Sequence, residues 1–372
     1  MKALPPPPQN RTARLLRDSH AAASAARLQY VNPEERGFRR CRSGKGFVYR
    51  DVNGRLVRDP SVLSRIRRLA IPPAWENVWI ARSENGHIQA TGYDVKGRKQ
   101  YRYHVAWRQV RDLAKFDDVV LFVQALPKLR RRLARDLREK APTKNKVLAV
   151  VVALMERTQL RVGNQKYAQQ NGSFGLTTLR DQHARIRGSE LNLRFKGKSG
   201  KLIDVRLHDR FLARAVKRCR DIPGQTLFQY YDEQGVRHAV TSTDVNNYLK
   251  EAMGHSFTAK EFRTWAASCL AAEHLLRALP CETATAGKKT LVRVAQLVAS
   301  ELGNTPSICR KCYIHPGIFD SYLKGELHDC LEKQLRKARK RRPPGLSVNE
   351  AAVIGLIEFL AEAASEELLL SA

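Results

Sequence analysis

The sequence predicts an α+β protein in which a small β-rich N-terminal domain precedes a larger, mainly α-helical domain that carries one inserted β-hairpin. From Tyr30 to about Trp107 apolar and polar residues alternate, and Asn-Gly dipeptides at 53–54 and 85–86 indicate tight turns between strands. After Trp107 the apolar spacing lengthens to about 3.6 residues, which is typical of amphipathic helices. A chain of 372 residues is long enough for two domains with separate cores.

The N-terminal part divides into two segments. Residues 1–28 are rich in Pro, Arg and Ala, and we expect a flexible basic arm with some helix. Residues 29–110 form the expected β-rich domain. It contains a hairpin in "GFVYRDVNGRLV", a short helix in "PSVLSRIRRLAIPPAW" and a second hairpin in "VWIARSENGHIQATGYD".

The rest of the chain is expected to be helical, with one exception. Within residues 111–330 the stretch "LNLRFKGKSGKLIDVRL" alternates on both sides of a "GKSG" turn, which predicts a β-hairpin. Residues 331–372 are expected to form a basic linker, "KQLRKARKRRPPG", and a final helix. A capping box, Ser347 and Glu350, indicates where this helix begins.

The charge of the chain points to a polyanionic partner. There are 67 Lys and Arg residues against 36 Asp and Glu, which gives a net charge of +31 and a pI near 10.3. An excess of this size repels itself, so we expect nucleic acid as the partner rather than a membrane. No lipidation motif, signal peptide or membrane-length apolar run is found, and the seven irregularly spaced cysteines suggest reduced thiols. A cytoplasmic, nucleoid-associated protein is the expectation.

The stretch "CRKCYIHP" at 309–316 has two interpretations. Cys309 and Cys312 have the spacing of a zinc knuckle, but the other cysteines form no second C-x-x-C pair. The two thiols also share one helical face, where they would be ordinary packing residues. We therefore expect no metal, and the phenol of Tyr313 becomes the candidate functional group.

A phenol can cleave a phosphodiester if it attacks phosphorus and conserves the ester bond as a covalent intermediate. Such a reaction needs cations or donors at the nonbridging oxygens and an acid for the leaving oxygen. Candidates for the charged and donor groups are Arg161, Arg263, Lys198 in the "GKSG" turn and Asn304. Each of these residues alone also fits a solvated or DNA-backbone role, so spacing does not decide between the two.

A resemblance carried by four ordered motifs favours the catalytic role for these residues. "LRVGNQKYAQQNGSFGLTTLRDQH", "FKGKSGK", "FTAKEFRTWAAS" and "NTPSICRKCYIHP" resemble the type IB DNA topoisomerases of the poxvirus and bacterial group, over about residues 30–325. The resemblance implies a catalytic domain with the tyrosine recombinase/topoisomerase IB-like fold. It implies Tyr313 as the nucleophile, Arg161 and Arg263 at the scissile phosphate, and Lys198 as the general acid. Asn304 lies where the viral and nuclear enzymes have histidine.

The same resemblance implies DNA contacts. "GRKQYRYH" (97–104) is similar to the DNA-reading strand of the group's N-terminal domain, where glutamine can read adenine and arginine or lysine can read guanine. The implied DNA-binding residues are Arg98, Lys99, Gln100, Tyr101 and Tyr103 in this domain, and Tyr167 and Lys260 in the catalytic domain.

The expected activity is therefore relaxation of supercoiled duplex DNA by a monomeric clamp, with no cofactor and neither ATP nor metal. A tyrosine site-specific recombinase is one alternative, although such enzymes usually have histidine where this chain has Lys260. A non-enzymatic architectural DNA-binding protein is the other. It would explain the charge but not the four ordered motifs.

Overall fold

The computed structural model describes the backbone of residues 19–370, and their side chains apart from 109–115, 117 and 363–370. Contacts divide the chain into two compact units, Met1–Asp118 and Val119–Ala372. The boundary falls inside one long helix, α4 (Val105–Asp136). Within the described residues, no helix has both the length and the apolar composition that crossing a bilayer requires.

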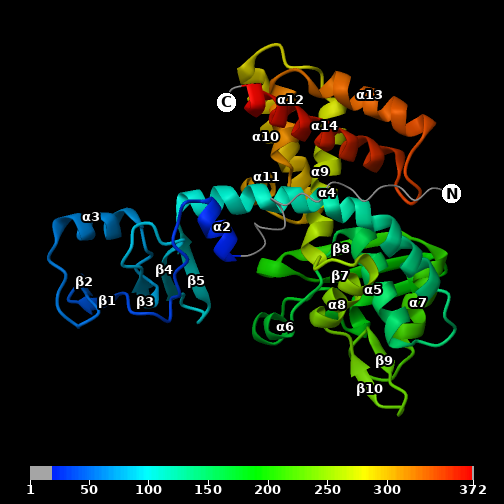
Figure 1. Cartoon of the computed structure of the whole chain (residues 1–372). Coiled ribbons are helices and arrows are strands. Elements are labelled where there is room, and N and C mark those ends of the chain that lie inside the picture. The colour runs from blue at the N-terminus through cyan, green and yellow to red at the C-terminus, as the bar shows by residue number, and fades with distance from the viewer. Residues whose placement is uncertain (1–18, 371–372) are drawn as a thin grey trace. The chain divides into compact units, whose positions relative to one another are not determined.

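The first unit is built on a five-stranded sheet in which all neighbouring strands are antiparallel, in the order β2-β1-β3-β4-β5 (Figure 1). The β-rich N-terminal region that the sequence predicts is therefore present. Besides the start of α4, its elements are α2 (Ser19–Ala25), β1 (Phe38–Ser43), β2 (Gly46–Arg50), α3 (Pro60–Arg68), β3 (Glu76–Ile80), β4 (Ile88–Tyr93) and β5 (Lys99–Tyr103).

The two faces of this sheet bury different side chains. Val78 and Ile80 of β3 pack with Ile66 of α3. Trp79 and Ala81 belong to a second buried cluster. This division follows from the strand period of two, which sends successive side chains to opposite faces.

The first hairpin differs from the expectation. β2 pairs with the preceding strand β1, and after the Asn53-Gly54 turn only an isolated bridge joins Arg50 to Leu56. β1 has the sequence "FRRCRS", whose charged residues hide any alternation, so the pattern gives no signal for it. The Asp51 carboxylate accepts hydrogen bonds from the main chain of Asn53 and Arg55, which stabilises the turn locally.

The second unit is mainly helical, as the sequence predicts. Its helices are α5 (Lys144–Thr158), α6 (Gln165–Asn171), α7 (Arg210–Arg220), α8 (Ser242–Met253), α9 (Ala259–Arg277), α10 (Ala284–Leu302), α11 (Pro306–Cys312), α12 (Pro316–Leu323), α13 (Leu327–Lys340) and α14 (Val348–Leu370), with short 3₁₀ turns η1 (Leu176–Thr178), η2 (Asp181–His183) and η3 (Lys198–Gly200). Its strands are β6 (Ala184–Arg187), β7 (Glu190–Lys196), β8 (Leu202–His208), β9 (Gln229–Tyr231) and β10 (Arg237–Ala239).

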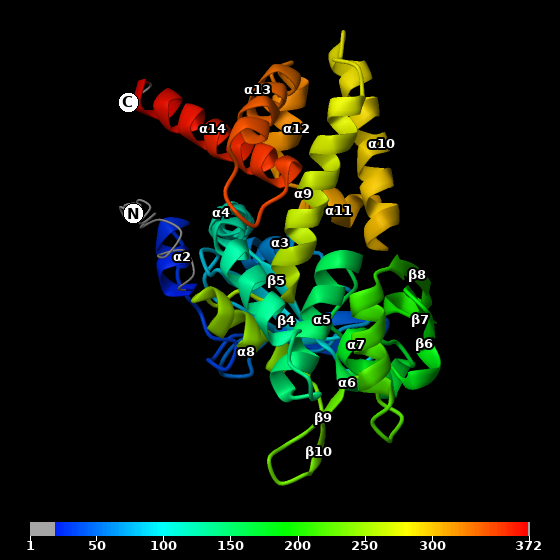
Figure 2. The same cartoon turned by 90° about the vertical axis from the view of Figure 1, so that its right-hand side faces the viewer.

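Helix α5 lies at the centre of this unit. Every residue from 146 to 155 is buried, because the helix contacts α7, α8, α9 and β9 on several sides (Figure 2). A helix that is apolar all round has to be surrounded by other elements. The residues that follow its C-terminus are therefore held close to the core.

Strand content in this unit exceeds the single hairpin that was expected. β7 and β8 pair across the "GKSG" turn, but β6 adds a third strand to their sheet, and β9 and β10 form a separate antiparallel pair. β9 and β10 have three residues each, too few for alternation to be recognised. The Asp232 carboxylate accepts from the main chain of Gln234 and Val236 and so stabilises the turn between them.

Residues 331–340, which were expected to be part of a linker, form most of α13 instead. Leu331 and Ala338 are buried, and α13 packs against α14. The basic side chains occupy the exposed face of an amphipathic helix. A run of basic residues is therefore not enough to predict a linker. The predicted capping box is confirmed: Ser347 N donates to the Glu350 carboxylate, and Glu350 N donates to Ser347 Oγ.

One ion-pair network joins four helices of this unit. Arg130 of α4 binds Glu156 of α5 and Glu350 of α14 at 2.7 Å each, and Trp265 Nε1 of α9 donates to Glu350 at 3.3 Å. Burial alone would raise the pKa of Glu350, but the hydrogen bonds from Arg130 and from the main chain of Ser347 outweigh it and lower the pKa to about 2. The carboxylate is therefore more stable in the folded protein than in the unfolded chain.

We expect Glu350→Gln to lower the free energy of unfolding by about 3 kcal/mol near neutral pH, because it leaves Arg130 with a neutral partner. A carboxylate whose pKa is lowered stabilises the fold above its ordinary value and loses that effect as it becomes protonated. The difference between wild type and variant should therefore shrink as the pH falls from about 4.5 towards 2. Urea unfolding at several pH values measures it.

Glu332→Gln is the matched control, because Glu332 pairs with Arg336 on the exposed face of α13. It should change the free energy of unfolding by less than about 0.5 kcal/mol. Equal losses in the two variants would contradict the structural role assigned to Glu350.

Candidate active site

Arg161 lies three residues beyond α5 and is held by main-chain hydrogen bonds. Leu176 N donates to Arg161 O at 2.9 Å. The main chain of Gly163 lies so close to Gly175 that a Cβ on Gly175 would be 2.6 Å from Gly163 Cα. The half-buried guanidinium donates from Nη2 to Asn304 Oδ1 at 2.5 Å. Burial lowers the pKa of Arg161, while the Tyr313 phenol acts in the opposite direction, so the two groups are neighbours.

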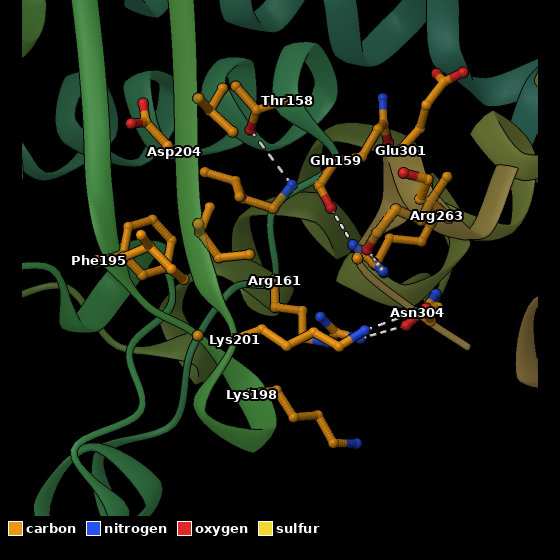
Figure 3. Close-up of a pocket in the computed structure, with 18 of the residues that line it drawn as sticks. Thr158, Gln159, Arg161, Phe195, Lys198, Lys201, Asp204, Arg263, Glu301 and Asn304 are labelled. Atoms are coloured by element: carbon orange, nitrogen blue, oxygen red, sulfur yellow. Dashed lines mark hydrogen bonds between the residues drawn. The ribbon is translucent and has the colours of Figure 1, made fainter. Parts of the chain in front are cut away.

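Arg263 is a buried cation on α9, with 5% of its surface exposed. Its Nη2 donates to Leu302 O at 2.6 Å and its Nη1 donates to Gln159 O (Figure 3). Its Nε is buried and has no partner among the described residues. Burial and the charge of Arg161 lower the pKa of Arg263, and Tyr313 raises it.

Asn304 connects the two arginine segments. α10 ends at Leu302 and is capped by Gly303, whose φ of 64° is left-handed, and Asn304 N donates back to Ala299 O at 2.9 Å. The side-chain oxygen is occupied by Arg161, whereas the buried Nδ2 has no partner among the described residues. The amide therefore has an unsatisfied buried donor, which costs free energy until it gains a partner.

Tyr313 ends α11, and its ring lies against Arg263. The guanidinium carbon of Arg263 is 5.5 Å from the ring centroid. Ser268, which is fully buried on α9, accepts from His315 N at 3.0 Å. Its own hydroxyl proton goes to Thr264 O at 2.9 Å, and Tyr313 O lies 3.4 Å from Oγ. One helix thus carries Arg263 and also binds the main chain just after Tyr313.

Lys198 is exposed in the turn between β7 and β8, at the rim of the same pocket (Figure 3). Lys201, at the end of this turn, donates from Nζ to Asn304 O at 3.3 Å. Sequence reasoning missed both Lys201 and Ser268. Each acts on main-chain atoms, so its side chain carries no recognisable pattern.

The pocket has a volume of about 360 Å³, and four of the five predicted catalytic residues line it: Arg161, Lys198, Arg263 and Asn304. The fifth, Tyr313, contacts Arg263 as described above. With Lys201, the lining contains four basic side chains. It contains two acidic ones, Asp204 and Glu301. Such a site can bind an anion of the size of a phosphodiester and present a phenol to it.

The two cysteines beside Tyr313 differ in exposure. Cys309 is fully buried, and burial raises the pKa of its thiol to about 11, whereas Cys312 is half-buried. Cys309 is therefore a protonated thiol inside the core at physiological pH. Among the described residues, no group of three or more His, Cys, Asp or Glu side chains has the arrangement of a metal site.

Five predicted DNA contacts belong to the first unit, on β5 and the turn before it: Arg98, Lys99, Gln100, Tyr101 and Tyr103. β5 is at the edge of the sheet. The rings of Tyr101 and Tyr103 stack with centroids 5.7 Å apart. Arg98 and Gln100 both bind the Asp94 carboxylate, at 2.6 and 3.0 Å, so reading a base would require them to exchange this partner.

The other two predicted contacts belong to the second unit. Tyr167 is exposed on α6, which begins directly after the Arg161 segment. Lys260 is exposed in the first turn of α9, three residues before Arg263. Both side chains are exposed, and neither is among the residues that line the pocket.

The chain is similar to known proteins over most of its length. Residues 104–341 match the family model described as "Eukaryotic DNA topoisomerase I, catalytic core", and residues 46–94 match "Bacterial DNA topoisomerase IB, N-terminal domain". DNA topoisomerase 1B of Acanthamoeba polyphaga mimivirus is 33% identical over 322 residues, which cover 82% of this chain and 96% of the viral protein.

Two poxvirus proteins are more distant. DNA topoisomerase 1B of vaccinia virus (strain Copenhagen) is 24% identical over 246 residues, or 65% of this chain and 74% of the viral one. DNA topoisomerase I of monkeypox virus is 22% identical over 245 residues, with the same coverage. The catalytic-core match spans more than half of the chain, and the match to the mimivirus protein covers most of both chains. The chain therefore belongs to the type IB DNA topoisomerases.

Proposed function

We propose that the protein relaxes supercoiled duplex DNA by cutting and rejoining one strand through Tyr313. The phenol oxygen attacks the scissile phosphorus, the bond to the 5′ oxygen breaks, and a 3′-phosphotyrosyl link holds the cut strand. The free 5′ end rotates, and its hydroxyl then attacks the phosphotyrosine and restores the DNA. The packing of the Tyr313 ring against the Arg263 guanidinium, beside a pocket of cations, carries this proposal.

Charge stabilisation comes from fixed donors. The transition state places negative charge on the nonbridging oxygens, and Arg161 and Arg263 stay charged throughout because guanidinium does not lose its proton in proteins. The buried Arg263 Nε and Asn304 Nδ2, without partners among the described residues, are the donors that a phosphate would satisfy. Both atoms are enclosed in this structure, so the phosphate reaches them through a local rearrangement of the pocket.

Lys198 protonates the departing 5′ oxygen, with Arg161 assisting. A lysine suits this role because its ammonium carries a transferable proton at the end of a flexible side chain. Lys198 lies on an exposed turn, so its side chain can reach a leaving group that a bound duplex brings to the pocket rim. The tight turn limits the movement of the main chain beneath it.

The reaction as proposed needs neither ATP nor a divalent ion. The phosphotyrosyl ester keeps the free energy of the phosphodiester, so rejoining needs no external source. The two arginines neutralise the developing charge that a metal ion neutralises in other phosphoryl-transfer sites.

Several finer features belong to the same proposal. The β7–β8 pair corresponds to the inserted hairpin of a tyrosine recombinase/topoisomerase IB-like catalytic domain. The strand β5 presents Tyr101 and Tyr103 to DNA, and a monomer that closes around duplex DNA acts at the cytoplasmic nucleoid. The net charge of +31 supports this choice of partner.

Two alternatives make different experimental predictions. A site-specific recombinase assembles on paired sites, so activity of a monomer on any supercoiled plasmid argues against it. An architectural DNA-binding protein forms no covalent adduct. Detergent trapping of protein on DNA therefore excludes the architectural alternative, and plasmid relaxation by a monomer excludes the recombinase.

Tyr313→Phe should bind duplex DNA with wild-type affinity but relax no plasmid and form no covalent adduct, because only the nucleophilic oxygen is removed. Plasmid relaxation without ATP or divalent ions and detergent trapping measure the two losses. Tyr231→Phe is the matched control, since Tyr231 is an exposed tyrosine of β9 outside the pocket. Adduct formation by Tyr313→Phe, or a wild-type activity abolished by EDTA, would contradict the mechanism.

Asn304→Asp tests the free donor separately from the contact with Arg161. Aspartate keeps an oxygen for Arg161 but replaces the Nδ2 donor with a second oxygen that repels phosphate. We expect single-turnover cleavage to slow by about 10²–10³-fold or more, as when an oxyanion donor is lost. A rate within about threefold of wild type would remove Asn304 from the transition state.

A further inference from the structure

The turn between β7 and β8 is bound to the loop after α10 by Lys201, a residue that the proposed mechanism does not use. Lys201 Nζ donates to the main-chain oxygen of Asn304 at 3.3 Å, although the two residues are 103 positions apart (Figure 3). Lys198, the proposed general acid, lies three residues before Lys201 in the same turn. A contact at Lys201 therefore acts on the part of the chain that carries the acid.

The turn is short and internally hydrogen-bonded, so the main chain at Lys198 moves with the main chain at Lys201. Gly197 N donates to Lys201 O at 2.8 Å, and Gly200 N donates to Gly197 O at 3.1 Å. Ser199 and Gly200 have left-handed φ values of 62° and 76°, which leave few alternative paths for the main chain.

The opposite side of the contact is also fixed. Asn304 N is bonded to Ala299 at the end of α10, and Asn304 Oδ1 is bonded to Arg161. A second contact supports the first: a Cβ built on Gly303 would lie 3.8 Å from Ile203 Cδ1, so the Ile203 side chain of β8 reaches this loop. The hairpin therefore has a polar and an apolar contact with the loop that carries Asn304.

We propose that Lys201 is a positioning residue that holds the β7–β8 turn so that Lys198 delivers its proton to the 5′ oxygen. This inference rests on the proposed role of Lys198. The Lys198 side chain is exposed and has many rotamers, so the location of its main chain decides how often the ammonium reaches the leaving oxygen. A displacement of about 1 Å at a catalytic group can cost about 10²-fold in rate.

Two other roles for Lys201 are physically reasonable. Its ammonium could leave Asn304 O and bind the scissile phosphate, or it could bind the DNA backbone away from the cut. Positioning is favoured because Lys201 Nζ already has a main-chain acceptor that is itself part of the pocket.

A duplex with sulfur in place of the bridging 5′ oxygen at the cut separates these roles. Tyr313 attacks phosphorus, the phosphorus–sulfur bond breaks, and the 5′ thiolate leaves without a proton because a thiol has a pKa of about 8.5. On the oxygen substrate, single-turnover cleavage by Lys201→Met at saturating enzyme should be about 10–100-fold slower than wild type. On the sulfur substrate its rate should return to within about threefold of wild type.

Three further variants complete the design. Lys198→Ala should be slow with oxygen and restored by sulfur, and the double variant Lys198→Ala/Lys201→Met should be no slower than Lys198→Ala alone, since both changes remove one proton transfer. Lys201→Arg keeps a donor and should retain most of the activity. Lys217→Met is the matched control, because it removes one exposed charge from α7, outside the pocket and the turn, and should leave the saturating rate unchanged.

The possible failures are distinguishable. If sulfur restores Lys198→Ala but not Lys201→Met, Lys201 acts on the phosphate and the positioning role is wrong. If Lys201→Met changes only the salt-dependent affinity for DNA, it is a backbone contact and the positioning role is again wrong. If sulfur does not restore Lys198→Ala, the proposed general acid is wrong and the inference fails with it.

Discussion

A buried guanidinium sets the architecture of the catalytic unit. Arg263 lies on α9 and is buried in the core of the unit. Removing its charge from water costs several kcal/mol unless the protein supplies acceptors. The acceptors are two main-chain carbonyls, Gln159 at the C-cap of α5 and Leu302 in the last turn of α10. Carbonyls at helix C-termini lack partners within the helix and carry partial negative charge. One cation therefore satisfies the ends of two helices.

This arrangement explains why residues far apart in sequence meet. Because α5 and α10 both end at Arg263, the residues just beyond each helix arrive at the same place: Arg161 after α5 and Asn304 after α10. α9 itself also carries Ser268, which binds the main chain around Tyr313. A lysine at position 263 has a single ammonium, whose donors cannot match the planar fork that binds both helix ends.

The sequence predicts long and strongly patterned features better than short or cooperative ones. The apolar period identifies α9 and α10, and the Ser347–Glu350 capping box gives the start of α14 to the residue. The sequence does not predict β1 or β9, because a strand rich in charged residues and a strand of three residues show no alternation. The chemistry of phosphoryl transfer and the ordered motifs suggest which side chains form the site. They do not reveal Ser268, Lys201 or the carbonyls around Arg263, because main-chain acceptors are the same at every residue.

The amide at position 304 fits an environment dominated by permanent positive charge. Its oxygen accepts from Arg161 while its nitrogen stays free to donate, so one neutral group both fixes an arginine and reaches a substrate. A neutral imidazole could also accept at one nitrogen and donate at the other. However, protonating it would place a third cation beside Arg161 and Arg263, and their charge would disfavour that state. Donation from an amide does not change with pH, so Asn304 adds no titrating charge beside the two arginines.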